Sequence, residues 1–298
     1  MIVRILGSAA GGGVPQWNCA CANCAAARTG RQPHRSQSSA AVSVDGARWL
    51  LLNCSPDVAA QIEAFRPLQP DGLRTTPIDG MLFTDANVDH LGGLATLRQT
   101  GNHRFIVRSS EVTRKIATSQ EAFVRFAAAP HRWIVAGFGE RCEPVDAADL
   151  VGNKLDVLAR AVPGTTPGYD GRRRIPGAVV AYEVSGGAGS LLLFAPVFAA
   201  IDDALRSAIE RADVAILDGT FFSEDELVSA QLLNKTAREL GHQPVGGPDG
   251  TLEQLRGVRT RIVFTHLNNS NPMLDPSSPA AEAVSEFGAE IAYDGMTL

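Results

Sequence analysis

Short apolar runs, each bounded by Gly, Pro, Asn or Asp, recur along the whole chain. Runs of this length with such boundaries are typical of buried β-strands. The segments between several of them carry apolar residues at helical spacing. The pattern predicts strands at 2–6, 40–44, 49–52, 80–83, 105–107, 155–159, 179–184, 191–195, 214–217, 261–265 and 291–293, and helices at 57–65, 92–99, 110–117, 201–211, 224–233, 251–258 and 279–287.

The order of these elements favours one α/β architecture. In each half of the chain paired strands come first and helices follow, which suits an αββα four-layer sandwich, two sheets face to face with helices outside. A single doubly wound sheet is the alternative, but Gly11-Gly12-Gly13 is followed by Val14-Pro15, which cannot open a helix as a phosphate loop must. No linker or low-complexity tract divides the chain, so we expect residues 1–298 to form a single domain.

Composition narrows the class of protein. Hydrophobic residues make up 45% of the 298 residues and charged residues 20%, as in a globular protein. The net charge of −5 argues against a nucleic-acid partner, and the one basic cluster, at 172–174, is expected to be a solvated loop. No apolar stretch has the length of a membrane span, and the first residues form a strand pattern rather than a secretory signal. We therefore expect a cytoplasmic protein, and the sequence leaves a homodimer open.

Three of the five cysteines, Cys19, Cys21 and Cys24, lie within six residues. In a reducing compartment such dense thiolates indicate a metal rather than disulfides. Zinc takes four tetrahedral ligands, so this cluster supplies three corners of a structural zinc site that pins a knuckle loop near residues 15–30. A redox pair is less favoured, because nothing in the sequence marks 21–24 as the start of a helix after a strand, where such a pair usually lies.

A second group of ligand-type residues follows the predicted strands. Asp89 and His90 lie in the segment 84–94, Asp218 follows the apolar run 214–217, and His266 follows 262–265. Side chains at strand ends project into a common mouth, so we expect these four to converge around one metal ion. Two imidazoles and carboxylates with open coordination positions suit non-haem Fe(II) and O₂ chemistry.

Two further residues are candidates for catalysis. Asp85 is predicted to be a further ligand or an anionic base beside the metal. His242 follows a helix-like stretch and a glycine typical of a helix end, and we expect it to act as a proton donor or to support the ligands. Neither a serine nucleophile elbow nor a Walker loop is present in the sequence.

These residues resemble those of the pyrroloquinoline quinone (PQQ) biosynthesis protein B family, within the metallo-β-lactamase fold superfamily. The matching segments are 7–19, 37–39, 53–57, 85–90, 218–221, 235–238, 241–242, 266–272 and 293–296, whereas 103–177 matches poorly. The superfamily signature for two metals places histidines where this chain has Asp85 and Asn87, and a further histidine where it has Thr165. The resemblance therefore implies that one metal position is kept and the other lost.

The resemblance also implies an activity and a fourth zinc ligand. It implies an iron-dependent oxygenase, an oxidoreductase that uses O₂ to hydroxylate a tyrosine-derived ring of a small or peptide-derived aromatic precursor during PQQ assembly. Fe(II) would be held by the four residues named above. More distant phosphodiesterases with a similar cysteine knuckle complete their zinc site with a histidine three places after the last active-site histidine. Asn269 stands at that place here, and its amide oxygen is expected to be the fourth zinc ligand.

Two other functions stay open at the level of the sequence. One is a metal-dependent hydrolase of phosphodiesters or cyclic esters, which would use a metal-activated water. The other is a non-catalytic carrier, with a role in transport of PQQ or its precursor toward the periplasm. Asp85, Asn87 and Thr165 argue against the hydrolase, because the first metal of a two-metal site would lose its imidazoles.

Overall fold

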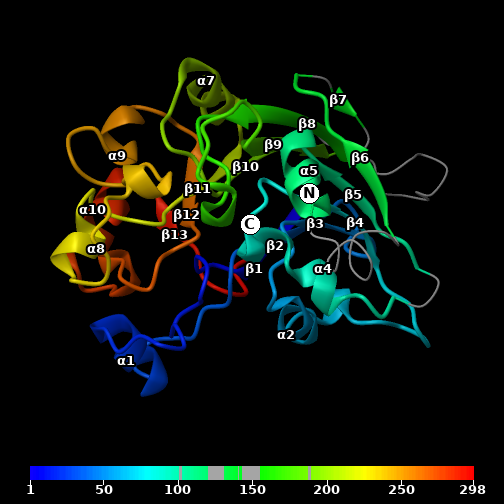
Figure 1. Cartoon of the computed structure of the whole chain (residues 1–298), viewed down its shortest axis with the longest axis horizontal. Helices are drawn as coiled ribbons and strands as arrows, with labels where there is room; N and C mark the ends of the chain where they lie inside the picture. Colours follow the sequence, from blue (N-terminus) through cyan, green and yellow to red (C-terminus); the bar gives the residue numbers. More distant parts are fainter. Residues whose placement is uncertain (101–102, 120–130, 140, 143–154, 187–188) are drawn as a thin grey trace.

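The computed structural model describes residues 1–298 apart from 101–102, 120–130, 140, 143–154 and 187–188. In this part of the chain the strands form two mixed sheets that lie face to face, and helices cover their outer faces (Figure 1). The predicted αββα sandwich is confirmed. The expectation of a single domain over 1–298 stays a prediction.

The first sheet, blue to green in Figure 1, has the strand order β1-β2-β3-β4-β5-β6. Its strands are β1 (Ile2–Gly7), β2 (Ser39–Ser43), β3 (Trp49–Leu52), β4 (Ile78–Leu82), β5 (Ile106–Ser109) and β6 (Arg132–Val135). The strands β1 to β3 pair antiparallel, and β3 to β6 pair parallel. Parallel neighbours need long crossover connections, which explains why most helices of this half lie between β3 and β6.

The second sheet repeats this plan in the order β13-β12-β11-β10-β9-β8-β7. Its strands are β7 (Arg141–Cys142), β8 (Leu155–Val162), β9 (Val179–Gly186), β10 (Leu191–Ala195), β11 (Val214–Asp218), β12 (Arg261–Thr265) and β13 (Glu290–Ile291). The strands β7 to β10 pair antiparallel, and β10 to β13 pair parallel. Both halves of the chain thus end in parallel strands joined by crossovers.

The helices connect and cover these strands. They are α1 (Ala22–Arg28), α2 (Val58–Glu63), α3 (Val88–Leu91), α4 (Gly93–Thr96), α5 (Glu111–Thr118), α7 (Asp203–Arg211), α8 (Glu226–Ser229), α9 (Thr251–Gln254) and α10 (Pro279–Phe287), with short 3-10 turns η1 (Arg66–Leu68), η3 (Gly168–Asp170), η4 (Arg238–Leu240) and η5 (Pro272–Leu274). None of the helices in the described ranges combines the length and the apolar character that crossing a membrane requires.

Some elements differ from the predictions. No helix was predicted near 21–24, yet α1 begins directly after Cys21, which occupies its N-cap position. The predicted helix 92–99 is wrong in part, since α3 and α4 meet at Gly92 and α4 ends at Thr96. Gly93 packs so closely that a Cβ there would overlap the Cys54 sulfur, so this junction is set by packing rather than by helical periodicity.

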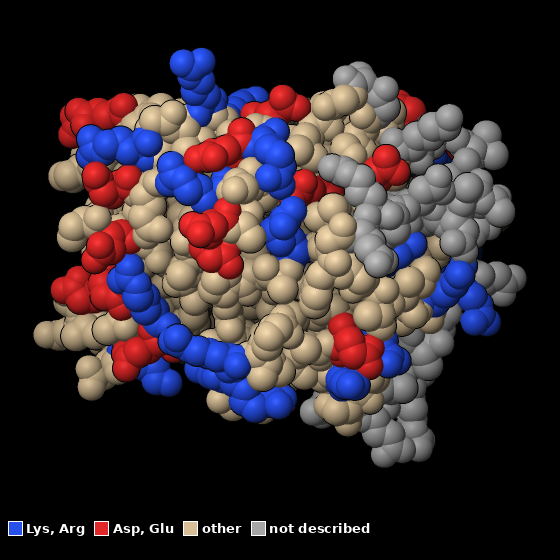
Figure 2. All heavy atoms as spheres, turned by 90° about the horizontal axis from the view of Figure 1, so that it is seen from above, with Lys and Arg blue, Asp and Glu red and all other residues tan. Residues whose placement is uncertain are grey.

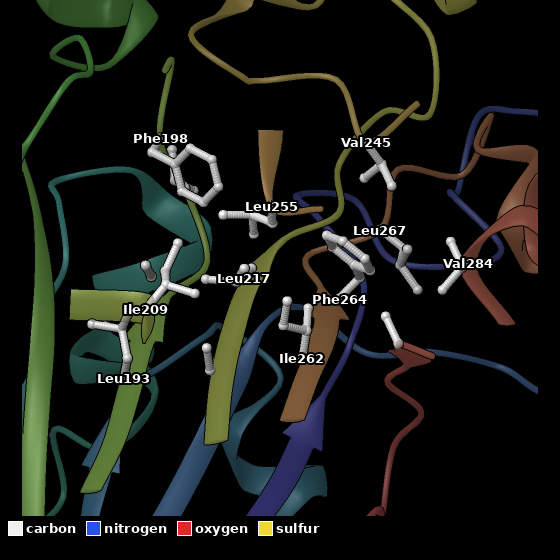
Figure 3. Packing of buried hydrophobic residues seen from close by; sticks show 14 of the residues in the cluster. Leu193, Phe198, Ile209, Leu217, Val245, Leu255, Ile262, Phe264, Leu267 and Val284 are labelled. Atoms are coloured by element: carbon white, nitrogen blue, oxygen red, sulfur yellow. The ribbon is translucent and has the colours of Figure 1, made fainter. Parts of the chain in front are cut away.

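Three clusters of buried apolar side chains separate the layers. One lies between the two sheets and includes Tyr182 and Phe194. A second lies between the second sheet and its helices, where Phe264 of β12 and Ile209 of α7 pack (Figure 3). The third lies under α2, α4 and α5 and contains Trp49. Full burial of each such large side chain contributes about 1.5–3 kcal/mol, so these clusters hold the strand ends that carry the site in place.

Acidic and basic side chains both occur across the described part of the face that Figure 2 shows.

Candidate metal centre

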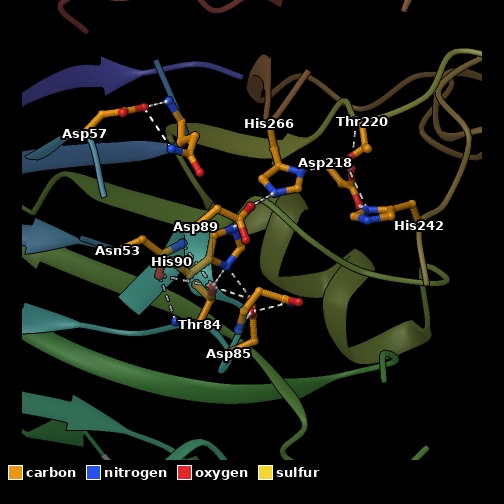
Figure 4. Close-up of polar contacts among 12 residues, drawn as sticks. Asn53, Asp57, Thr84, Asp85, Asp89, His90, Asp218, Thr220, His242 and His266 are labelled. Atoms are coloured by element: carbon orange, nitrogen blue, oxygen red, sulfur yellow. Dashed lines mark hydrogen bonds and ion pairs between the residues drawn. The ribbon is translucent and has the colours of Figure 1, made fainter. Parts of the chain in front are cut away.

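Ligand-type side chains from both halves of the sandwich meet at one end of the sheets (Figure 4). Asp89 and His90 lie on α3, which follows β4, Asp218 is the last residue of β11, and His266 comes directly after β12. Carboxyl ends of parallel strands are the usual place for such sites in α/β proteins. The structure therefore brings the four predicted ligands together, in two clusters that share His266.

The first cluster consists of Asp89, His90 and His266. The carboxylate oxygen Oδ2 of Asp89 lies 3.2 Å from Nε2 of His266 and 3.6 Å from Nε2 of His90. His90 is buried, and its Nε2 has no hydrogen-bond partner. Burying a ring nitrogen without a partner is costly unless the nitrogen coordinates an ion. Two imidazoles and one carboxylate thus fit a single divalent cation.

Asp85 lies behind His90, on the side away from this cluster. Its Oδ2 is 2.6 Å from His90 Nδ1 and accepts a hydrogen bond from Thr84, and its Oδ1 accepts the backbone and side-chain N–H groups of Asn87. A carboxylate that accepts the Nδ1–H of a histidine leaves the Nε2 lone pair free for a metal. Because both of its oxygens are occupied, this arrangement favours a positioning role for Asp85 over the predicted role of ligand or base.

The charge of His90 depends on its carboxylate neighbours. Burial disfavours the charged imidazole, but Asp85 and Asp89 outweigh burial and raise the pKa of His90 to about 9. Burial also opposes ionisation of Asp89, yet His90 and His266 hold the pKa of its carboxyl well below the usual range. In the metal-free protein the His90 ring is therefore protonated on both nitrogens at neutral pH. An incoming cation must displace the proton on Nε2.

The second cluster consists of Asp218, His242 and His266. His242 Nδ1 lies 2.8 Å from Asp218 Oδ2, and the rings of His242 and His266 stack with their centroids 5.5 Å apart. The hydroxyl of Thr220 donates to Asp218 and lies 2.7 Å from His266 Nδ1. His242 thus reaches the site, and Asp218 lies beside His242 rather than within the first cluster.

His266, which belongs to both clusters, has an unusual backbone and a neutral ring. Its φ of +62° lies in the left-handed region, which residues with a side chain rarely adopt. Burial lowers the pKa of His266, as does His90 nearby, although Asp89 opposes this. Burial would raise the pKa of Asp218, but His242 and His266 lower it. A neutral imidazole beside an ionised carboxylate is the state that metal coordination requires.

A separate thiol cluster lies in the N-terminal loop. The sulfur atoms of Cys19, Cys21 and Cys24 lie within 4.8 Å of one another, and the three cysteines are free. The side-chain nitrogen of Asn269, from the loop after β12, lies 3.2 Å from Cys19 Sγ. Three thiols at this spacing fit zinc. A half-turn of the amide would present its oxygen instead, and Asn269 as the fourth ligand stays a prediction.

A cleft of about 230 Å³ opens beside the two histidine-containing clusters. Asp89, His242 and His266 line one side of it, and Thr165 and Arg172 line the loop that faces them. The expectation of a solvated loop at 172–174 is therefore wrong for Arg172, which is half-buried, while the next two arginines are exposed. A sequence pattern cannot show which side of a loop faces a cleft.

The sequence pattern also missed the hydroxyl groups that join the ligands. Thr220 connects Asp218 with both of its histidine neighbours. Thr84 bonds Asp85 and is itself held by Asn53, whose side-chain oxygen accepts the Thr84 N–H at 3.0 Å. The sequence does place each threonine within two residues of a predicted site carboxylate, and Thr220 falls in the matching segment 218–221.

Known proteins share this chain's sequence and fold. A family model described as a beta-lactamase superfamily domain matches residues 48–267. Coenzyme PQQ synthesis protein B of Methylococcus capsulatus is 37% identical over an alignment that covers 100% of this chain and 99% of that protein. Its counterpart in Azotobacter vinelandii is 40% identical with the same coverage. The chain belongs to the coenzyme PQQ synthesis protein B family.

Solved structures agree with this family. The crystal structure of Zn²⁺-bound PqqB from Methylobacterium extorquens has a TM-score of 0.92 and 36% identity, and the match covers 100% of this chain and 99% of that one. A diphosphatase of the PhnP family has a TM-score of 0.68 at 20% identity, a likeness of fold alone. Membership in the protein B family, together with the ligand clusters, supports metal binding and a role in coenzyme PQQ synthesis.

Proposed function

We propose that this protein is an iron-dependent oxygenase of coenzyme PQQ synthesis that hydroxylates a tyrosine-derived ring of a peptide-derived precursor. The first cluster carries the proposal, because Asp89, His90 and His266 offer two imidazoles and one carboxylate to a metal ion. The buried Nε2 of His90 lacks a hydrogen-bond partner and is one of these donors. This donor set leaves coordination positions open for substrate and O₂. Bound Fe(II) would supply the activation of O₂.

The net reaction replaces a ring C–H bond by C–OH. One oxygen atom of O₂ enters the ring, and the other leaves as water after uptake of two electrons from an external reductant and two protons. His242 is placed to move protons, since its ring lines the cleft and its Nδ1 is held by Asp218 and Thr220. A histidine oriented in this way is placed to act as a general acid or base.

Anaerobic reconstitution with Fe(II), followed by exposure to labelled ¹⁸O₂, tests the proposal. We expect iron bound at the histidine clusters and one labelled oxygen atom in the product ring. His90→Ala should lose both the iron and the product, whereas His103→Gln, which lies outside the clusters, should keep both. Normal turnover by His90→Ala, or label that comes from water, would exclude an oxygenase of this kind.

A metal-dependent hydrolase is the second candidate, and one observation favours it. The clusters around Asp89 and Asp218 share His266, so the site offers ligand atoms for two neighbouring cations. Such pairs of metals activate water for hydrolysis. A rate that follows Zn²⁺ or Mn²⁺, with two ions at the site and no need for O₂, would identify this activity. The absence of histidines at positions 85, 87 and 165 argues against it.

A further inference from the structure

Arg172 is the one Lys or Arg among the described residues that line the cleft beside the metal clusters. Its guanidinium donates Nη1–H to the carbonyl oxygen of Leu240 at 3.1 Å. Within the described ranges it has no carboxylate partner, whereas the adjacent Arg173 pairs with Asp170 at 2.6 Å. A guanidinium has five N–H donors, so most of those on Arg172 are available to a ligand.

The loop around Arg172 is held in place from two sides. Gly171 and Arg172 have φ values of +83° and +51°, a left-handed turn that sets the direction of the side chain. The backbone N–H of Thr166 donates to the Arg173 carbonyl oxygen at 3.0 Å, and the Tyr169 hydroxyl donates to a carbonyl oxygen of the segment between β4 and α3. A guanidinium fixed before the ligand arrives loses little freedom on binding.

The charges around the cleft favour an anionic ligand. Asp89 is the one Asp or Glu among the described residues that line the cleft, and in the metal-loaded site its carboxylate would face the cation beside neutral histidine ligands. The positive charge of Arg172 then has no counterion among the described lining residues. A planar guanidinium in a partly enclosed site binds a carboxylate through two parallel hydrogen bonds, which gives both affinity and orientation.

The size and lining of the cleft limit what this carboxylate can belong to. A volume of about 230 Å³ suits one ring with a short polar arm. Phe221 and Val197 offer apolar contact to a ring, and Asn268 offers an amide to polar groups. We propose that Arg172 binds a carboxylate of the substrate and so selects aromatic molecules that carry one. This role rests on the proposed function, because the ring must reach the first cluster.

Binding of two small probes to the Zn²⁺-loaded protein tests this role without turnover. L-tyrosine and tyramine differ by the carboxylate, and isothermal titration calorimetry measures the affinity of each. We expect the wild-type protein to bind L-tyrosine roughly tenfold or more tightly than tyramine, as a charge-assisted pair predicts. Arg172→Gln should lower the affinity for L-tyrosine by about the same factor and leave that for tyramine within about twofold.

Two variants serve as controls. Arg173→Gln removes a neighbouring guanidinium that already has a partner, so it should change neither affinity. Arg172→Lys keeps the charge but loses the planar fork, and it should keep only part of the selectivity. Zinc content, measured on every variant, shows that the metal sites remain intact.

The outcomes separate this role from the oxygenase itself. Equal effects of Arg172→Gln and Arg173→Gln, or no preference of the wild-type protein for L-tyrosine, would overturn the role of Arg172. Selective binding that persists in a protein without hydroxylation would overturn the oxygenase and leave the carboxylate site standing. Hydroxylation without selective binding would overturn the role of Arg172 and leave the oxygenase standing.

Discussion

His90 can coordinate a metal through Nε2 because Asp85 holds its other nitrogen at 2.6 Å. Asp85→Asn replaces this anionic acceptor with a weaker one. We expect the affinity for the active-site metal to fall roughly 10- to 100-fold, as for other outer partners of metal-binding histidines, and a competition titration against a chelator measures it. Asp57→Asn, whose carboxylate instead accepts hydrogen bonds from Gln37, should leave that affinity unchanged. Unchanged affinity in Asp85→Asn would remove the positioning role.

Glu226 is a buried carboxyl group outside both metal sites. Burial raises its pKa to about 7, although the Ser270 hydroxyl and the Phe222 N–H donate to it. The folded protein therefore holds this proton more tightly than the unfolded chain, where the pKa is about 4.5. The free energy of unfolding should fall by about 3 kcal/mol in all as pH rises from about 4.5 to about 7. Above about pH 7 it should level off.

Glu226→Gln keeps one of the two acceptor oxygens that the Ser270 hydroxyl and the Phe222 N–H use, and it removes the ionisation. Urea denaturation at pH 5, 6, 7 and 8 should therefore show a smaller loss of stability with rising pH in this variant than in the wild-type protein. Glu253→Gln, at an exposed position paired with Arg256, provides the control and should follow the wild-type curve. Parallel curves for Glu226→Gln and the wild-type protein would contradict the prediction.

At the scale of elements, α1 depends on its contacts with the rest of the molecule. It has seven residues, too few for a stable isolated helix. It begins directly after Cys21 of the thiol cluster, and the side-chain amide of Asn23 donates to carbonyl oxygens of Asn269 and Asn271 at 3.0 Å each. The Cys21 thiol also donates to the Asn269 carbonyl oxygen at 3.4 Å, so Asn23 and the thiol cluster together tie α1 to the loop after β12, which also carries His266.

Cys24→Ser should release zinc and loosen this connection. We expect loss of one zinc per chain and faster hydrogen exchange in α1 and in the loop that contains Asn269, because the thiol cluster no longer joins them. Cys54→Ser is the matched control, since Cys54 is buried away from the thiol cluster, and it should keep its zinc. If Cys24→Ser kept full zinc, the thiols would not form the structural site.

Local pattern predicted elements well where burial alone determines them. Leu191–Ala195 and Arg261–Thr265 coincide with predicted strands because continuous apolar runs mark buried parallel strands. The pattern did not predict α1, whose stability comes from distant contacts, or β6, whose side chains are only partly buried. Similarly, Asp89 and His90 could be predicted from their position in a motif, whereas Arg172 could not, because its role depends on where a loop lies in space.

At the scale of the whole molecule, the candidate metal ligands come from two sheets. His90 follows β4 of the first sheet and His266 follows β12 of the second, so one cation would connect both halves. A metal that binds only the folded state should raise the free energy of unfolding by about 2.7 kcal/mol at a concentration 100-fold above its dissociation constant. Denaturation at increasing metal concentrations measures this gain. His90→Ala should lose most of it, and an undiminished gain would show that the metal binds elsewhere.

The left-handed backbone of His266 offers a way to distinguish the role of its imidazole ring from that of its main chain. Glycine adopts a φ of +62° without strain, so His266→Gly relaxes the main chain while it opens a ring-sized hole between the two clusters. Free imidazole in the buffer should then enter that hole and restore metal content. The same addition should not help His90→Ala, whose lost ring was enclosed on all sides. Chemical complementation of this kind would assign the shared ligand without any knowledge of the substrate.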